Sequence, residues 1–160
     1  MKANIMWVFK FYRKEYIIRK NNKAETMLKT GVCGDDCNYC PRYMATLSGN
    51  EERLKDVAKM WVTAGWRKAE DAVEKIKCRG CGTVKACGLG VKDCAAEKRV
   101  ESCGECRDYP CEKMAKIFEG NQKEAPVCKK ALTDSDYWLF QKAFFSKKAR
   151  LDIIREELNR

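Results

Sequence analysis

Cysteine is the residue that most constrains how this chain can fold. The sequence of 160 residues contains 11 cysteines, ten of them between residues 33 and 111. Six of these form three C-x-x-C pairs: Cys37/Cys40, Cys78/Cys81 and Cys103/Cys106. Two intervening residues let a tight turn present both sulfurs to one tetrahedral ion. The repeated spacing therefore predicts a fold organised by cysteine-bound metal, with zinc as the expected ion.

Disulfides are the competing explanation for so many cysteines, and the expected compartment argues against them. The apolar stretch 5–9 is short and is followed at once by Lys10, without a small-residue cleavage site. No apolar run approaches the roughly 20 residues of a membrane span. We therefore expect a cytoplasmic protein with no membrane association, in which reducing conditions keep thiols unpaired.

The chain contains no histidine. Catalytic zinc commonly uses histidine and keeps one position open for water, whereas an all-cysteine shell is typical of closed structural sites. The absence also removes serine–histidine and cysteine–histidine nucleophiles. We therefore expect a non-catalytic interaction module rather than an enzyme, and assign no catalytic residue.

Iron–sulfur ligation is the main chemical alternative, because such clusters are also held by four thiolates. The spacing from Cys33 through Cys37 to Cys40 matches that of a radical-SAM cluster motif, but no glycine-rich methionine-binding pattern follows. An iron–sulfur or thiol redox protein of anaerobic metabolism therefore stays open as the second hypothesis.

All ten clustered cysteines are candidate metal ligands. They are Cys33, Cys37, Cys40, Cys78, Cys81, Cys87, Cys94, Cys103, Cys106 and Cys111. One grouping places residues 78, 81, 87 and 94 on one ion, and residues 103, 106 and 111 with an N-terminal cysteine on another. A rival grouping pairs the 78/81 and 103/106 turns. Cys128 stands apart and is expected to be an ordinary thiol.

Apolar periodicity and capping residues predict mainly short helices around cysteine-rich loops. Expected helices cover 41–47, the stretch from a cap at Asn50 to a stop at Gly65, 69–76, and 111 to a stop at Gly120. Helix resumes after Pro126, with a cap at Thr133 and a last apolar stripe at Leu151, Ile154 and Leu158. Residues 78–111 are expected to be loops and single turns. The predicted fold class is a small, mainly α, metal-stabilised domain.

Charge divides the chain into three parts. Residues 1–30 hold 8 Lys/Arg against 2 Asp/Glu, residues 31–128 hold 17 against 16, and residues 129–160 hold 8 against 5. We expect a basic N-terminal extension (1–28), for which strand and helix fit equally well, a cysteine-rich metal-binding domain (29–128), and C-terminal helices packed on it (129–160). The partner is unknown. A protein partner fits the interaction-module hypothesis, and any nucleic-acid binding would be weak, non-specific and confined to the basic ends.

The order of the cysteine motifs resembles one protein family. The motifs are Cys33-Gly34-x-x-Cys37-x-x-Cys40-Pro41-x-Tyr43, Cys78-x-Gly80-Cys81, then Cys87 and Cys94, then Val100-x-x-Cys103-x-x-Cys106-x-x-Tyr109-Pro110-Cys111. Over about residues 31–120 the chain is similar to the domain of unknown function 3795 family of bacteria and archaea. The resemblance implies zinc binding and leaves the activity open.

Side chains beside the cysteine turns have simple structural explanations. Tyr43 and Tyr109 are expected to cover the metal sites rather than stack on a base. Asp35 and Asp36, in a loop between candidate ligands, are expected to be exposed.

Overall fold

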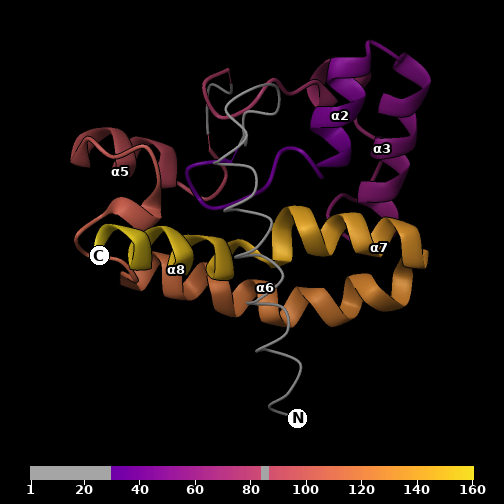
Figure 1. The fold of residues 1–160 in the computed structure, drawn as a ribbon. Helices are drawn as coiled ribbons and strands as arrows, with labels where there is room; N and C mark the ends of the chain where they lie inside the picture. The colour runs from indigo at the N-terminus through magenta and orange to yellow at the C-terminus, as the bar shows by residue number, and fades with distance from the viewer. Residues whose placement is uncertain (1–29, 84–86) are drawn as a thin grey trace.

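The computed structural model describes residues 30–83 and 87–160, and this part of the chain is mainly helical (Figure 1). Its elements are α2 (Pro41–Ser48), α3 (Glu51–Thr63), α4 (Val73–Ile76), α5 (Val91–Lys98), the 3-10 turn η1 (Cys103–Glu105), α6 (Glu112–Ala131), α7 (Asp134–Phe140), the π-helical segment η2 (Gln141–Phe145) and α8 (Lys147–Leu158). Extended pairing in these residues is limited to a bridge between Thr30 and Asp36. The predicted mainly α class is confirmed. The N-terminal extension 1–28 lies outside the described residues.

Helices α2 and α3 begin and end where local sequence signals place them. Pro41 occupies the first turn of α2, and Gly49 ends it with φ 66°. The Asn50 side chain accepts hydrogen bonds from the backbone N–H groups of Glu52 and Arg53 and so caps α3. Leu54, Val57, Ala58 and Trp61 of α3 are buried as one apolar stripe.

Helix α6 is longer than the sequence pattern predicts. The stop expected at Gly120 is wrong, because the helix continues through both Gly120 and Pro126 to Ala131. Met114 and Phe118 are buried near its start and Cys128 near its end. Burial at both ends outweighs the local cost of glycine and proline, since most helical stability in proteins comes from packing of an apolar face.

Residues 78–111 also depart from expectation. They are not only loops and single turns, because α5 forms two helical turns within them and buries Val91 and Ala95. In the preceding segment, helix is limited to Val73–Ile76 rather than the expected 69–76.

The C-terminal helices contain an irregularity that periodicity did not predict. The Thr133 side chain caps α7, as expected, by accepting the N–H of Asp136. Helix α7 then passes directly into η2, where the Ser146 hydroxyl donates to the Gln141 carbonyl at 2.8 Å. In the expected apolar stripe of α8, Leu151 is fully buried, whereas Leu158 is 59% exposed.

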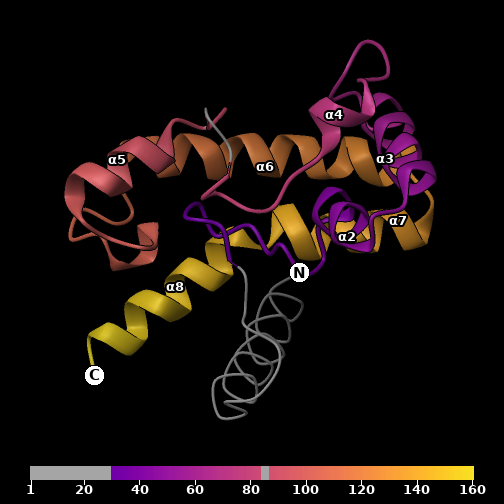
Figure 2. The same cartoon turned by 90° about the horizontal axis from the view of Figure 1, so that it is seen from above.

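Two apolar cores lie along α6. The first core joins α2 and α3 to the α6 end and α7, and includes Trp61, Cys128 and Phe140. The second core joins α5, η1 and α8 to the start of α6, and includes Tyr109, Met114 and Leu151. Both ribbon views place α2–α4 and α5 toward opposite ends of α6 (Figures 1 and 2). Helix α6 therefore connects the two halves of the described fold.

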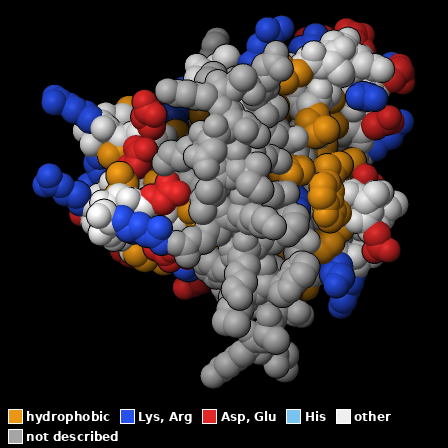
Figure 3. Space-filling view, in the orientation of Figure 1, with side chains coloured by type: hydrophobic (Ala, Val, Ile, Leu, Met, Phe, Trp, Pro, Cys, Tyr) orange, Lys and Arg blue, Asp and Glu red, His pale blue; other side chains and the backbone are white. Residues whose placement is uncertain are grey.

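The surface is highly charged. On the face seen in Figure 3, lysine, arginine, aspartate and glutamate side chains are interspersed around the visible edges, and apolar side chains gather between them. Within residues 30–83 and 87–160, none of the helices has the length and apolar character needed to cross a bilayer.

Candidate metal centres

Four cysteines from two distant segments line one cleft. This first thiol group consists of Cys37, Cys40, Cys78 and Cys81, and its cleft has a volume of about 390 Å³. The first pair lies just before α2, and the second pair follows α4. Tyr43 also lines the cleft and is buried.

Hydrogen bonds of backbone and side-chain groups shape both turns of the first thiol group. The Asp36 carboxylate accepts bonds from the N–H and side-chain amide of Asn38, each at 3.0 Å, and the N–H of Cys40 donates to the Cys37 carbonyl at 3.2 Å. In the second turn the N–H of Gly80 donates to the Cys78 sulfur at 3.4 Å. The exposure expected for Asp35 and Asp36 is wrong: Asp36 is 3% exposed, and the Asp35 side chain is 28% exposed and pairs with Lys147.

Helix α2 joins the two turns. The Arg42 side chain donates to the carbonyls of Lys75 and Lys77, at 2.9 and 3.2 Å, and to that of Ile76. The N–H of Cys78 donates to the Thr46 hydroxyl at 2.9 Å. One face of α2 therefore holds the second cysteine turn beside the first.

The electrostatics of the first thiol group reflect this proximity. Burial, followed by the charges of Cys40, Cys81 and Cys78, raises the pKa of Cys37 to about 12. Burial also raises the pKa of Cys40 to about 11, although the backbone N–H groups of Tyr43 and Arg42 act against it. The raised pKa values favour the protonated thiols of Cys37 and Cys40 at neutral pH, whereas a divalent ion would favour their thiolates.

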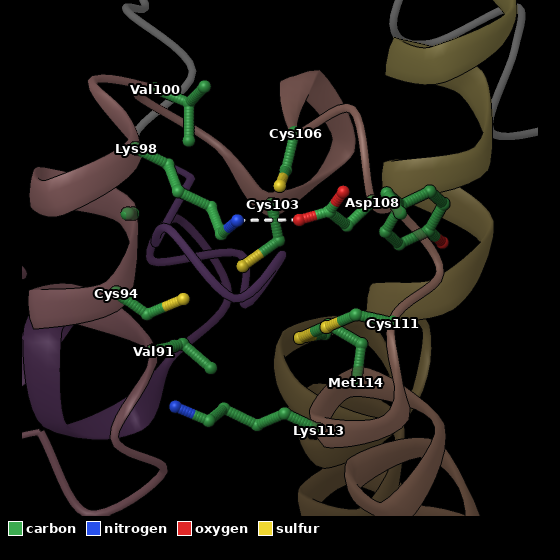
Figure 4. Close-up of a pocket in the computed structure, with 12 residues that line it drawn as sticks. Val91, Cys94, Lys98, Val100, Cys103, Cys106, Asp108, Cys111, Lys113 and Met114 are labelled. Carbon is green, nitrogen blue, oxygen red and sulfur yellow. Dashed lines mark hydrogen bonds and ion pairs between the residues drawn. The ribbon is translucent and has the colours of Figure 1, made fainter.

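A second thiol group lines a small cavity of about 40 Å³ at the other half of the fold. It consists of Cys94 on α5, Cys103 and Cys106 in and after η1, and Cys111 at the start of α6. Figure 4 shows these side chains around a common space. Burial, followed by the charges of Cys111, Cys94, Cys106 and Cys87, raises the pKa of Cys103 to about 11.

The second thiol group is held by its own network. A capping box encloses η1, in which the Ser102 hydroxyl accepts the Gly104 N–H and the Glu105 carboxylate accepts the Ser102 N–H. Tyr109 lines the cavity, is 9% exposed and donates its hydroxyl to Asp152 at 2.6 Å. Tyr109 thus lies against the thiol cavity, and Asp152 of α8 holds its hydroxyl.

Two further candidates lie outside these groups of four. Cys87 is close enough for its charge to affect Cys103. Burial acts to raise the pKa of Cys87, but backbone N–H groups at the start of α5 outweigh it and the net pKa is lowered. Cys33 is buried in the second core, and burial together with Asp35 raises its pKa. Cys33 is not among the described residues that line the two thiol cavities.

The arrangement differs from both groupings expected from the sequence. Those groupings joined the 78/81 turn either to residues 87 and 94 or to the 103/106 turn, whereas the fold places it beside Cys37 and Cys40. Cys128, expected to stand apart, is buried in the first core, and its thiol donates to the Ala64 carbonyl at 3.8 Å.

The chemistry of each donor set fits a thiophilic ion, because cysteine thiolates are soft ligands. In the described part of the chain, no three cysteine, aspartate or glutamate side chains are arranged closely enough to hold an ion.

The fold and these thiol groups define a small, helical, cysteine-rich domain. The family model for DUF3795, a family of proteins of unknown function, matches residues 29–116. Because the match spans more than half of the chain, the protein belongs to the DUF3795 family, which confirms the resemblance seen in its motifs. Neither the curated proteins nor the solved structures contain a significant match to it.

Proposed function

We propose that this protein is a zinc-stabilised interaction module with two structural, all-cysteine centres. The first thiol group would hold one ion and the second thiol group the other. The observation that carries the proposal is that eight cysteines lie in two groups of four. In the first group, Cys37 and Cys81 are 44 positions apart along the chain. Four thiolates form the shell typical of a closed structural zinc site.

The composition and surroundings of the two groups support a structural role. The chain has no histidine, and Tyr43 and Tyr109 are buried beside the thiols. When bound, zinc would supply the cross-link that joins the paired turns, and its binding free energy would contribute to folding. The protein's own residues shape those turns through the bonds of Asp36 and Ser102.

An exposed aromatic side chain supports the interaction role. Trp138 is 48% exposed, and its ring packs edge-on against Tyr39, with 5.4 Å between ring centroids. Tyr39 lies between Cys37 and Cys40, so the first centre would hold an aromatic surface in place. Tryptophan and tyrosine are enriched in the contact surfaces of protein interfaces.

The test is the metal content of protein purified without oxygen. We expect about two zinc per chain and a colourless sample. Cys81→Ser and Cys106→Ser should each lose about one zinc, and Cys128→Ser should retain both. Iron with acid-labile sulfide, or no tightly bound metal, would contradict the proposal.

One observation favours the redox alternative. Cys87 is a partly exposed fifth thiol beside the second group, with a lowered pKa, and such thiols are the more reactive ones. Under this alternative, limiting iodoacetamide should label Cys87 first in metal-loaded protein. Added hydrogen peroxide should oxidise the Cys87 thiolate to a sulfenic acid with release of water, and Cys87→Ser should abolish this oxidation, which a thiol reductant reverses. Equal labelling of all cysteines would count against it.

A further inference from the structure

Helix α8 contacts the loops that carry both thiol groups. A Cβ atom at Gly34, in the Cys33–Cys37 loop, would lie 2.8 Å from Cγ of Leu151 and 2.9 Å from the Lys147 carbonyl. A Cβ at Gly104, between Cys103 and Cys106, would lie 2.8 Å from the Leu151 carbonyl. Both loops therefore need glycine to approach α8, and both meet it at the fully buried Leu151.

Buried charges fix the first loop to α8 and to the π-helical segment. Arg150, 6% exposed, donates to the Gly34 carbonyl at 2.8 Å. Lys147, 4% exposed, pairs with Asp35 at 2.9 Å, and the N–H of Asp36 donates to the carbonyl of Ala143 in η2 at 2.9 Å. Displacing the loop would remove partners from two buried cations, which is costly.

The second loop is bound to the same helix and also to the first loop. Tyr109 donates to Asp152 at 2.6 Å, and Arg155 donates to the Cys106 carbonyl. The N–H of Cys103 donates to the Val32 carbonyl, beside Cys33, at 2.9 Å. The two loops thus share a direct bond and a common helix, which lies beyond the residues matched by the family model.

We propose that α8 couples the two centres, so that metal at one raises the metal affinity of the other. This inference rests on the proposed function. Metal binding at one group would order its loop and thereby α8. The second group would then bind its ion with a smaller loss of conformational entropy, because the shared helix is already ordered. Because coupling between binding sites is reciprocal, either ion produces the same effect on the other.

The experiment uses zinc alone, the reduced full-length chain and two single-centre variants. Cys78→Ser removes the first centre and Cys94→Ser the second, and neither residue lies on α8. Competition with a chromophoric chelator gives the overall constant for two ions and the constant of each remaining centre. The coupling factor is the overall constant divided by the product of the two single-centre constants. We expect it to be about ten or more, within the usual range of coupling.

Two variants test whether α8 carries the coupling. Leu151→Ala removes the side chain against which the first loop packs and should reduce the factor toward one. Leu132→Ala makes the same chemical change beside the first core, in which no α8 residue is found, and should leave the coupling factor unchanged. Equal effects of the two variants would overturn the role of α8.

If a serine variant does not fold, native mass spectrometry of the unsubstituted chain during zinc addition decides. At its maximum, the singly loaded form should be less abundant in the unsubstituted chain than in Leu151→Ala, and equal abundance in the two would overturn the inference. Two zinc ions bound with a coupling factor of one would overturn the inference alone. A chain that binds no zinc would overturn both it and the proposed function.

Discussion

Replacing Gly34 by alanine tests the close packing of the first cysteine loop against α8. Gly34 has φ 88°, a conformation that costs an L-residue about 1–2 kcal/mol. Its new Cβ would also lie 2.8 Å from Leu151 and 2.9 Å from the Lys147 carbonyl, and overpacking of this kind costs about 1–3 kcal/mol. The expected loss is therefore about 2–5 kcal/mol, a large part of the stability of an ordinary domain.

Gly65→Ala is the matched control. Gly65 also has a positive φ, 76°, but a Cβ there would meet nothing within 4 Å, so only the backbone cost of about 1–2 kcal/mol applies. Urea unfolding of both variants in the presence of zinc, followed by tryptophan fluorescence, measures the difference. If Gly34→Ala were as stable as Gly65→Ala, the close approach of the loop to α8 would be refuted.

Three further variants probe the thiol groups and their surroundings. Cys81→Ser should lose about one zinc and lower the midpoint of thermal unfolding, because three thiolates bind the ion less well than four. Unchanged zinc content would contradict the proposal that Cys81 is a ligand of the first thiol group. Cys128→Ser should keep all metal and cost about 1 kcal/mol of stability in the first core, and loss of metal would refute its separation from the ligands. Tyr109→Phe should cost about 1–2 kcal/mol, because the Asp152 carboxylate loses the Tyr109 hydroxyl as a donor and keeps its bond from Lys148. Burial and the bond to Asp152 raise the pKa of Tyr109. The protonated Tyr109 hydroxyl therefore contributes its full stabilisation of the folded state below pH 10.0, the pKa in the unfolded chain, and this contribution is lost as the pH rises further. The stability difference between wild type and Tyr109→Phe should accordingly narrow above pH 10.0, and a constant difference would contradict the assignment.

Local signals in the sequence were enough to predict several helices and the candidate ligands. Asn50 and Thr133 cap helices because their side chains reach backbone N–H groups two or three residues away. The stripe of α3 follows from the helical period, which places Leu54, Val57 and Trp61 on one face. The short C-x-x-C spacing likewise concerns one turn of chain, so each pair was visible without knowledge of the rest of the fold.

The extent of α6 and α5 could not be read from local signals. Gly120 and Pro126 ordinarily end helices, yet α6 continues because the two cores bury Phe118 before these residues and Cys128 after them. The π-helical segment is equally non-local: it presents the Ala143 carbonyl to the N–H of Asp36, more than 100 residues earlier.

The sequence by itself determined that the protein is a mainly helical domain with ten clustered cysteines, since composition, capping and spacing are properties of neighbouring residues. Tertiary structure decided which thiols lie together. Hydrogen bonds from Arg42 hold the Cys78 turn beside Cys37 and Cys40. Gly34 and Gly104 both pack closely against Leu151 of α8. The physical reason is that these contacts join segments far apart along the chain, and packing and buried hydrogen bonds, rather than local propensity, select among the possible pairings.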